Sequence, residues 1–423
     1  MQHTPPTFAK RQRGAATVVV TLVLLAAMLL VAVFANHGLL LEARMSANQA
    51  RSTVAFEAAE AGLEWTLAQL NDTSRIGADC RGVAGGLTSF RERYLSMGVA
   101  PSGFTGRPGA SGAPLRPACV RNVAGWACSC PTDAAAAFAA PDAEDAAAAF
   151  VVEFLPGRQQ GVVRVVATGC TGLAGACASG STTNADAVAR VEASFALLPA
   201  LATAPAAALT TRGNIDAGST AIGAHNTDPA SSGVALHAGG TIEAASARFS
   251  APAGASLANI VAGNDTALAA LDGERLFVSY FGLSKQAWKN QPVVRRVGCE
   301  GDCTADLAAA IGSEVTNPMI WIGGDASIEG PVTLGQAGRP VAIVVEGRLQ
   351  LRGDVTLHGV VYANGMAWNG HVAGGAQVRG ALVSESGYAG DAAPDLYRDA
   401  EVLAALRQHT GSFVRVAGSW RDF

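Results

Sequence analysis

The stretch "KRQRGAATVVVTLVLLAAMLLVAVFA", Lys10–Ala35, decides how the front of this chain folds. Three cationic residues, Lys10, Arg11 and Arg13, precede a glycine, and no charged residue follows until after Ala35. As a helix, the uncharged block is about 30 Å long, which is enough to cross the hydrocarbon core of a bilayer. The cationic residues predict that the leader stays in the cytoplasm while the rest of the chain faces outward.

The position of Gly14 separates this segment from an ordinary signal peptide. A signal peptide has a shorter apolar core, and its small-residue cleavage site comes after that core. Here the only junction-like glycine comes before the apolar block. Cleavage there would leave the hydrophobic helix as the new N-terminus, able to rest in a bilayer and later to pack among identical helices in a fibre. The alternative is a single-pass anchor that is not processed.

This arrangement resembles that of a type IV prepilin, and the resemblance implies cleavage between Gly14 and Ala15 by a prepilin peptidase. The next stretch, "LLLEARMSANQARSTVAFEAAEAGLEW" (Leu39–Trp65), is similar to the front helix of PilX-family minor pilins, with the matching elements at Met45–Gln49 and Ala55–Ala61. The resemblance covers roughly residues 11–70. Beyond it, only the general layout and the ending "GSWRDF" are similar.

One position departs from the pattern of major pilins. Those proteins carry a glutamate at the fifth mature position, where it pairs with the N-terminal amine of a neighbouring subunit. Counting from Ala15, the fifth residue here is Val19. A buried charge without its partner costs several kcal/mol, so Val19 disfavours ordinary addition beneath an existing subunit. The resemblance therefore implies a subunit at the end of a fibre.

Length and composition limit what the rest of the chain can be. At 423 residues the chain is long enough for two or three domains. Charged residues make up only 15% of it, and 49 residues are glycine, which favours tight turns and close backbone packing. The net charge is −4, with no basic run outside the leader. Nucleic-acid binding therefore has no electrostatic basis.

Eight cysteines predict disulfides, because the chain carries an export signal and such bonds persist in oxidising compartments. Cys128 and Cys130 are too close in sequence to bridge each other. We expect them to pair with Cys80 and Cys119, which leaves two connectivities open. The other expected pairs are Cys170 with Cys177 and Cys299 with Cys303. Zinc is the weaker alternative, because no pair has a histidine at ligand spacing.

The residues after the apolar block favour helix as far as about Leu70, since they are rich in alanine, glutamate and leucine and contain no proline. One flank of this helix carries apolar residues, and a polar strip lies beside that flank. Trp65 falls nearly opposite and forms a second apolar flank. Two apolar flanks predict two packing partners, the protein's own head and a neighbouring helix; the alternative is that the head covers both flanks. The first flank contains Phe56, Leu63, Leu67 and Leu70, and the strip contains Glu57, Glu60 and Glu64.

Residues 71–198 are assigned to an α+β head. Three strands with alternating patterns are predicted, "FVVEFLP" (Phe150–Pro156), "GVVRVVATGC" (Gly161–Cys170) and "DAVARVEASFALL" (Asp186–Leu198). We expect them to form a small antiparallel sheet packed on the front helix. A Cys170–Cys177 bridge would close the loop between the last two.

Residues 199–423 are assigned to a second domain because a short glycine pattern recurs there. The pattern has five positions: a glycine, any residue, an apolar residue, a polar residue and an apolar residue. It begins at Gly213, Gly240, Gly324, Gly347, Gly353 and Gly374. Several repeats lie roughly 20 to 27 residues apart, as when strands stack coil upon coil. Alternation places Ile215, Ile242, Leu349, Leu351, Val355 and Leu357 inward. We interpret the pattern as a right-handed β-solenoid; the alternative is a β-sandwich with glycine-rich turns.

A helical insertion interrupts this repeat between about residues 265 and 318. Its aromatic residues, Phe277, Tyr280, Phe281 and Trp288, are predicted to be core. Another helix is expected over Asp395–His409, followed by a last strand, "SFVRVAGSW".

The acids and histidines of the second domain do not suggest catalysis. Solenoid lyases and esterases need clustered acids, arginines or a calcium cage on one face. Here Asp216, Glu243, Glu329 and Asp354 occur singly, and no Ser/His/Asp or His/Glu/His spacing is present. We therefore expect no enzymatic activity, no cofactor and no metal. The competing hypothesis is a membrane-tethered solenoid hydrolase that acts on a polysaccharide.

The resemblance implies a minor pilin that helps to start type IV pilus assembly, sits near the tip, and supports twitching motility and adhesion. Its implied partners are other minor and major pilins, the prepilin peptidase, the inner-membrane assembly platform and a large tip adhesin. The precursor would span the bacterial inner membrane once, with a periplasmic head, before entering the fibre at the cell surface. The alternative within the same class is a K-type pseudopilin of a type II secretion system.

Overall fold

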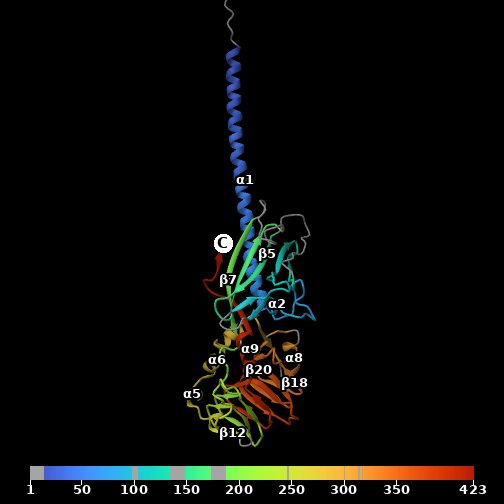
Figure 1. Ribbon diagram of the computed structural model, residues 1–423, viewed down its shortest axis with the longest axis vertical. Helices are drawn as coiled ribbons and strands as arrows, with labels where there is room; N and C mark the ends of the chain where they lie inside the picture. The colour runs from blue at the N-terminus through green and yellow to red at the C-terminus, as the bar shows by residue number, and fades with distance from the viewer. Residues whose placement is uncertain are drawn as a thin grey trace, which may run out of the picture.

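The structure, a computed structural model, describes residues 14–97, 103–133, 148–172, 187–244, 247–299, 301–312, 315–316 and 318–423. Three parts follow one another along its longest axis: a protruding helix, a head with an antiparallel sheet, and a domain of parallel strands (Figure 1). The helix, α1, runs from Ala15 to Asn71 without interruption. At 57 residues it is about 85 Å long. The predicted end of the front helix, near Leu70, is confirmed.

The head is built around an antiparallel sheet, with seven strands in the part of the chain that the structure describes. The predicted strands are confirmed as β5 (Ala149–Pro156), β6 (Val162–Cys170) and β7 (Val188–Pro199). They continue into β3 (Ala118–Asn122) and β4 (Gly125–Ser129) on one side. The short elements α2 (Phe90–Tyr94), β1 (Leu95–Met97) and β2 (Phe104–Gly106) lie beside the sheet.

The C-terminal end of α1 packs directly on this sheet. Leu63 and Leu70 are fully buried and share one core with Phe150 and Val165. The closest approach is at Gly169 in β6, where a Cβ atom would lie 2.0 Å from the Ala55 carbonyl oxygen. Glycine is required there because any side chain would push the helix away from the sheet.

The head sheet is completed by the last residues of the chain. β24 (Gly411–Arg415) and β25 (Arg421–Asp422) both pair antiparallel with β7. From the sequence, the last strand is expected to belong to the second domain, because it follows that domain in the chain. In the structure, residues 200–410 are an insertion between two neighbouring strands of the head. The two ends of the insertion meet, with the Ala200 N–H donating to the Thr410 carbonyl at 2.8 Å, so the insertion leaves the head sheet intact.

Within its described residues the second domain contains sixteen strands, and all pairings among them are parallel. We call it the parallel stack. β-Sandwiches are built from antiparallel sheets, so the parallel pairing does not fit the sandwich alternative. The strands form three rows, and three long strands, β19 (Val341–Arg352), β20 (Val355–Asn369) and β21 (Gln377–Ser384), take part in two or three of them.

Each row has a defined spatial order. The first row is β15 (Val294–Val297), β16 (Met319–Ile322), β19, β20, β21, β8 (Leu209–Thr211), β11 (Leu236–Ala238) and β14 (Val261–Ala262). The second is β17 (Ala326–Glu329), β19, β20, β22 (Tyr388–Gly390), β9 (Ile215–Gly218) and β12 (Ile242–Ala244). The third is β18 (Val332–Leu334), β20, β21, β23 (Asp395–Tyr397), β10 (Gly223–His225) and β13 (Arg248–Ser250).

The spatial order of the stack differs from the order of the chain. The chain enters at β8 in the middle, winds outward to β14, passes through a helical segment, and begins again at the opposite end with β15. It then winds back until β21 pairs with β8, with Leu382 opposite Leu209. The repeat pattern predicts coils, but it does not predict the pairing of β21 with β8. The residues of a parallel strand do not indicate which distant strand it pairs with.

The predicted inward residues lie in the core of the stack. Ile215, Leu349, Leu351, Val355 and Leu357 are all at most 5% exposed. Ile242 is half-buried because β12, which carries it, is the last strand of its row.

The first helices of the helical insertion cover the outer side of the first row, and its last helix lies across one end of the stack. The insertion contains α5 (Thr266–Ala269), α6 (Gly273–Phe281), α7 (Lys285–Lys289) and α8 (Thr304–Ile311), and it also contributes β15. The prediction that its aromatic residues are core is confirmed: Phe277, Phe281 and Trp288 are buried, and Tyr280 packs against the same cluster. The helix expected over Asp395–His409 is shorter. Its first residues form β23, and α9 covers Ala400–Gln408.

Candidate polymerisation helix and processing site

The predicted processing site lies where α1 begins. Gly14 occupies the N-cap position with φ −98°, and Ala15 is the first helical residue. A Cβ atom at Gly14 would have no neighbour within 4 Å. Neither backbone conformation nor packing therefore requires glycine at this position. The orientation residues Lys10, Arg11 and Arg13 lie outside the described residues.

The first part of α1 exposes apolar side chains on all sides. Ala16–Phe34 is long and apolar enough to cross a membrane, and none of it is buried against the rest of the chain. The hydroxyl groups of its two threonines donate hydrogen bonds to the helix backbone: Thr21 to the Thr17 carbonyl at 3.0 Å, and Thr17 to the Gly14 carbonyl at 2.9 Å. No polar side-chain group in this segment needs water, which suits a lipid or helix-bundle environment.

Val19 lies within this apolar surface and is 60% exposed. Its neighbours Val18 and Val20 are similarly exposed and also apolar. The first turns of α1 from Ala16 onward therefore present no carboxylate that could neutralise the amine of an adjacent chain.

The last part of α1 is covered by the protein's own head on both predicted flanks. Trp65 packs edge-on against Phe90, with ring centroids 5.3 Å apart, and also contacts Phe150. On the other side, Phe56 packs edge-on against Trp420 at 6.3 Å. Of the two interpretations of these flanks, coverage by the head fits both aromatic residues.

The polar strip of α1 is held by the C-terminal tail. Trp420 donates its indole N–H to Glu60, and Arg415 forms an ion pair with Glu64 at 2.5 Å. Asn71, the last helical residue, accepts from the Phe413 N–H at 2.8 Å and donates to the Phe413 carbonyl at 2.9 Å. The tail therefore fixes the direction in which α1 leaves the head.

Arg91 connects the helix, the head and the parallel stack, and sequence reasoning missed it. Its guanidinium donates hydrogen bonds to three carbonyl groups. They belong to Leu70 at the end of α1, to His409 after α9, and to Gly411 at the start of β24. It also lies 4.8 Å from the centre of the Phe413 ring. Burial lowers the pKa of Arg91 to about 10, so it stays charged at neutral pH. Nothing in the sequence around Arg91 marks this role, because two of its partners are more than 300 residues away.

The disulfides follow one of the two expected connectivities. Cys80 pairs with Cys130, and Cys119 with Cys128, which ties the β3–β4 hairpin to the loop after α1. The predicted Cys299–Cys303 pair is also present. Cys177 lies outside the described residues, so the Cys170–Cys177 prediction stays untested.

The fold brings together a serine, a histidine and an aspartate that sequence spacing does not reveal. His225 of β10 lies between Ser250 of β13, with Nδ1 2.9 Å from Oγ, and Asp395 of β23, with Nε2 3.1 Å from Oδ1. The aspartate also pairs with Arg248 at 2.7 Å, and the imidazole stacks on Tyr397. Adjacent strands of the third row place these residues side by side. Among the described residues, no group of three His, Cys, Asp or Glu side chains could hold a metal ion.

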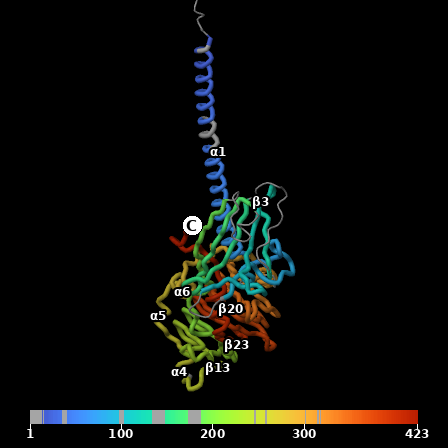
Figure 2. The backbone as a smooth tube through the Cα atoms, turned by 45° about the horizontal axis from the view of Figure 1, so that its top comes forward, coloured from blue at the N-terminus to red at the C-terminus, as the bar shows by residue number. Residues whose placement is uncertain are grey.

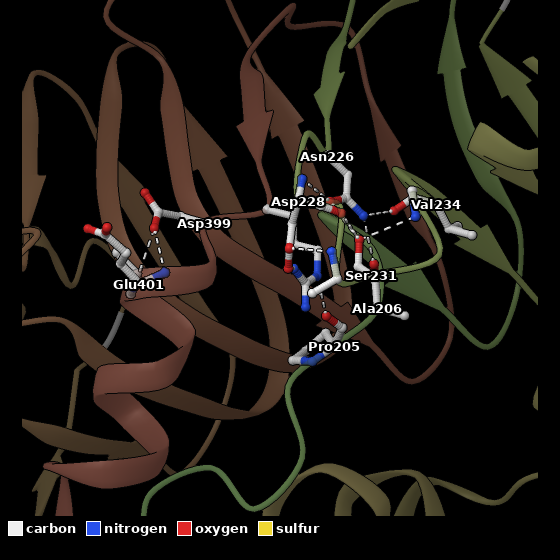
Figure 3. A network of polar contacts seen from close by, with 12 residues as sticks. Pro205, Ala206, Asn226, Asp228, Ser231, Val234, Asp399 and Glu401 are labelled. Atoms are coloured by element: carbon white, nitrogen blue, oxygen red, sulfur yellow. Dashed lines mark hydrogen bonds and ion pairs between the residues drawn. The ribbon is translucent and has the colours of Figure 1, made fainter. Parts of the chain in front are cut away.

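A partly buried polar network, shown in Figure 3, holds the joint between the two halves of the stack. Arg398 donates to Asp228 at 2.6 Å and to the Pro205 carbonyl at 2.9 Å. Asn226, fully buried, donates to the carbonyls of Ala206 and Val234. The Ala230 N–H, and then the Arg398 guanidinium, hold the pKa of Asp228 below its usual value. The network therefore fastens the start of the stack to the segment that leaves it.

Comparison with known proteins finds a match at the front of the chain. The PilX N-terminal family model matches residues 13–64, which contain the start of α1 and most of its length. The resemblance to PilX-type minor pilins is thereby confirmed over this segment.

Two further comparisons add no functional assignment. No curated protein matches the sequence. A solved structure, the competence-associated pilin ComZ from Thermus thermophilus, aligns over 88% of this chain and 98% of its own, with 13% identity and a TM-score of 0.22. A TM-score this low means that the two folds do not superpose as wholes, so the likeness supports no conclusion about this chain.

Proposed function

We propose that this chain is a minor pilin that helps to initiate type IV pilus assembly and sits at or near the pilus tip. The observation that carries the proposal is the division of α1 within the PilX-like segment. Residues 16–34 are apolar and uncovered, whereas the last turns are fixed in the head. A helix built this way can exchange lipid for neighbouring helices without unfolding its own head.

The terminal position is supported by Val19 and by the bulk beyond the head. A major pilin stacks repeatedly, which requires a carboxylate at this position and room above each head. Val19 supplies no carboxylate, and the parallel stack extends from the head on the side away from the start of α1 (Figure 1). Another subunit placed above this one would meet that bulk.

The parallel stack itself is, we infer, a right-handed β-solenoid. Each pass of the chain visits the first, second and third rows in the same sequence, for example through β8, β9 and β10 and then β11, β12 and β13. The interval per coil is 27 residues from Ile215 to Ile242 and 23 from Ala326 to Leu349. These intervals are those of stacked solenoid coils.

The Ser250–His225–Asp395 cluster does not lead us to propose an enzyme. A serine hydrolase also needs oxyanion donors aimed at a substrate carbonyl beside the nucleophile. Here the nearby Asn226 N–H donates to the Ser250 carbonyl and the Arg398 N–H to the His225 carbonyl, so neither is free. We interpret the cluster as a structural ladder across the third row.

The remaining parts of the proposal concern partners and location. Gly14 and Ala15 are the site of the prepilin peptidase, followed by N-methylation, and the leader cations set the orientation in the inner membrane. The assembly platform, the other pilins and a large tip adhesin are the proposed partners, with twitching motility and adhesion as the outcome. A glycine at position 14 that the fold does not require supports a role in recognition rather than in folding.

The test replaces Gly14 with leucine in the native host. We expect Gly14→Leu to block maturation and to reduce surface pili at least about tenfold, because the peptidase needs a small residue there. Gly323→Leu is the matched control: Gly323 is exposed, and a Cβ atom there has 3.9 Å of clearance. Sheared pili would be quantified for both strains. Normal piliation in the Gly14→Leu strain would contradict the proposal, and a loss of protein secretion with normal pili would favour the pseudopilin alternative.

A further inference from the structure

The two ends of the parallel stack are finished differently. At one end, α8 lies across β15, β17 and β18, and its Leu307 is fully buried in the core. The loop before α8 also satisfies the backbone of the end strand: the Cys303 N–H donates to the Ser327 carbonyl, and the Glu329 N–H donates to the Thr304 hydroxyl. At this end, α8 and the residues before it therefore occupy the position that a further coil would take. We call it the capped end.

The other end stops in the middle of a coil. The last coil begins with β14 in the first row, and the chain then turns away at Asn264 and Asp265 into α5. The strands that would follow in the second and third rows are missing from that coil. Within the described residues, β12 is paired on one side only, with β9, and β13 on one side only, with β10. Half of their backbone groups therefore point off this open end.

The open end also exposes core side chains. Ile242 and Phe249 are half-buried, whereas their counterparts one coil inward, Ile215 and Ala224, are fully buried. A cavity of about 490 Å³ lies there, lined by Gly218, Ile242, Glu243, Ala244, Phe249 and Val261. Terminal repeats of a stacked fold normally need a polar cap, so this surface is built to be covered.

We infer that the open end binds an extended segment of a partner protein, which completes the unfinished coil by adding strands parallel to β12 and β13. The segment needs about nine residues, the length from Ile242 to Ser250, with apolar side chains over Ile242 and Phe249. A basic residue belongs opposite Glu243, which is exposed and has no ion pair within the described residues. The inference deepens the proposed function, because it names the surface through which a tip subunit holds its partner.

The molecule contains an example of this kind of docking. The coil that starts at β8 is not continuous in sequence with the coil that starts at β21, yet the two pair in all three rows. The registers are Leu382 with Leu209, Tyr388 with Ile215, and Leu396 with Ala224. All six side chains are buried. A coil edge of this stack therefore accepts a segment from elsewhere through parallel pairing and apolar contact.

A second copy of the chain does not fit the open end. Head-to-tail stacking is blocked because α8 covers the other end. The open end lies far from the start of α1 (Figures 1 and 2), and two open ends that face each other through a two-fold axis would pair their strands antiparallel. The pairings of β12 and β13 within the stack are parallel, so such a pair would not continue the coil. These points leave a different protein as the occupant, and its role as the partner of a tip subunit rests on the proposed function.

The test uses the full chain in detergent micelles and a fluorescent nine-residue peptide that copies residues 242–250 with Glu243→Lys. We expect saturable binding below about 1 mM peptide, with slowed hydrogen exchange at β12 and β13 and not at β17. Phe249→Lys in the protein should weaken binding at least about tenfold. Glu243→Lys should weaken it about threefold and should strengthen binding of the unsubstituted copy by a similar factor.

Controls keep the outcome decisive. Glu329→Lys, on the end strand β17 at the capped end, should leave binding unchanged. Because Glu243 is exposed, the charge exchange still tests the site if Phe249→Lys impairs folding. Absence of saturable binding, or binding indifferent to both Phe249→Lys and Glu243→Lys, would overturn the inference. Self-association of the chain that Phe249→Lys abolishes would also overturn it, by assigning the open end to a second copy. None of these readouts involves pili, so failure here leaves the minor-pilin proposal to its own test.

Discussion

The two parts of α1 belong to one unbroken helix but meet different surroundings. From Ala16 to Phe34, apolar side chains face outward in every direction, and none is covered. From Ala55 to Leu70, small and apolar residues face the head sheet while acidic residues face the C-terminal tail. The difference shows that helix formation and helix burial are set separately. Composition makes the whole segment helical, whereas the position of small residues decides which part its own head covers.

The largest effect that sharpens this comparison comes from a matched pair of leucine truncations. Leu63 is fully buried, and Leu25 is 58% exposed. We expect Leu63→Ala to lower the free energy of unfolding of the head by about 2–5 kcal/mol, because it leaves a cavity against the sheet. Leu25→Ala should change that free energy by less than about 0.5 kcal/mol. Urea unfolding in detergent, followed by tryptophan fluorescence, measures both. Equal losses would show that the two parts of the helix are not energetically distinct.

A smaller effect concerns the tail that holds the polar strip. Trp420 contacts Phe56 and donates to Glu60. We expect Trp420→Ala to cost about 1–2 kcal/mol, from one aromatic contact and one hydrogen bond. Phe423→Ala is the control, because Phe423 is 71% exposed, and it should have almost no effect. The same unfolding measurement applies. If both variants behave like the unsubstituted chain, the tail does not fix α1 to the head.

The smallest predicted effect is a pH dependence of stability that is located in the parallel stack. Residues 16–34 of α1 have no such dependence, because they contain no charged residue. The pKa of Asp228 is lowered in the folded chain by the Ala230 N–H and by Arg398. Ionised Asp228 therefore contributes stability that is complete above its unfolded pKa, near 4, and lost as the pH falls through the lower folded value. We expect Asp228→Asn to cost about 1 kcal/mol at pH 7 and much less at pH 3. A cost that is unchanged at pH 3 would contradict this assignment.

The sequence predicts what depends on neighbouring residues and misses what depends on distant ones. The bounds of α1, the strands β5 to β7, the Cys299–Cys303 pair and the inward residues of the coils all follow from local composition or alternation. The joint of β8 with β21 does not, because a parallel edge accepts any strand of suitable register. The return of β24 to the head and the hub at Arg91 were missed for the same reason. At the candidate site, the roles of Gly14, Ala15 and Val19 stay predictions, and they come from consecutive residues: leader cations, a glycine and an apolar block.

The central claim is that the apolar part of α1 becomes the N-terminus of the mature protein. Intact mass spectrometry of the full chain, purified from cells with and without the prepilin peptidase, tests it directly. We expect a mature chain that begins at Ala15 when the peptidase is present and a precursor that retains Lys10, Arg11 and Arg13 when it is absent. A chain that keeps its leader in both strains, or one cut after Ala35, would show that the apolar helix is not exposed as a new N-terminus.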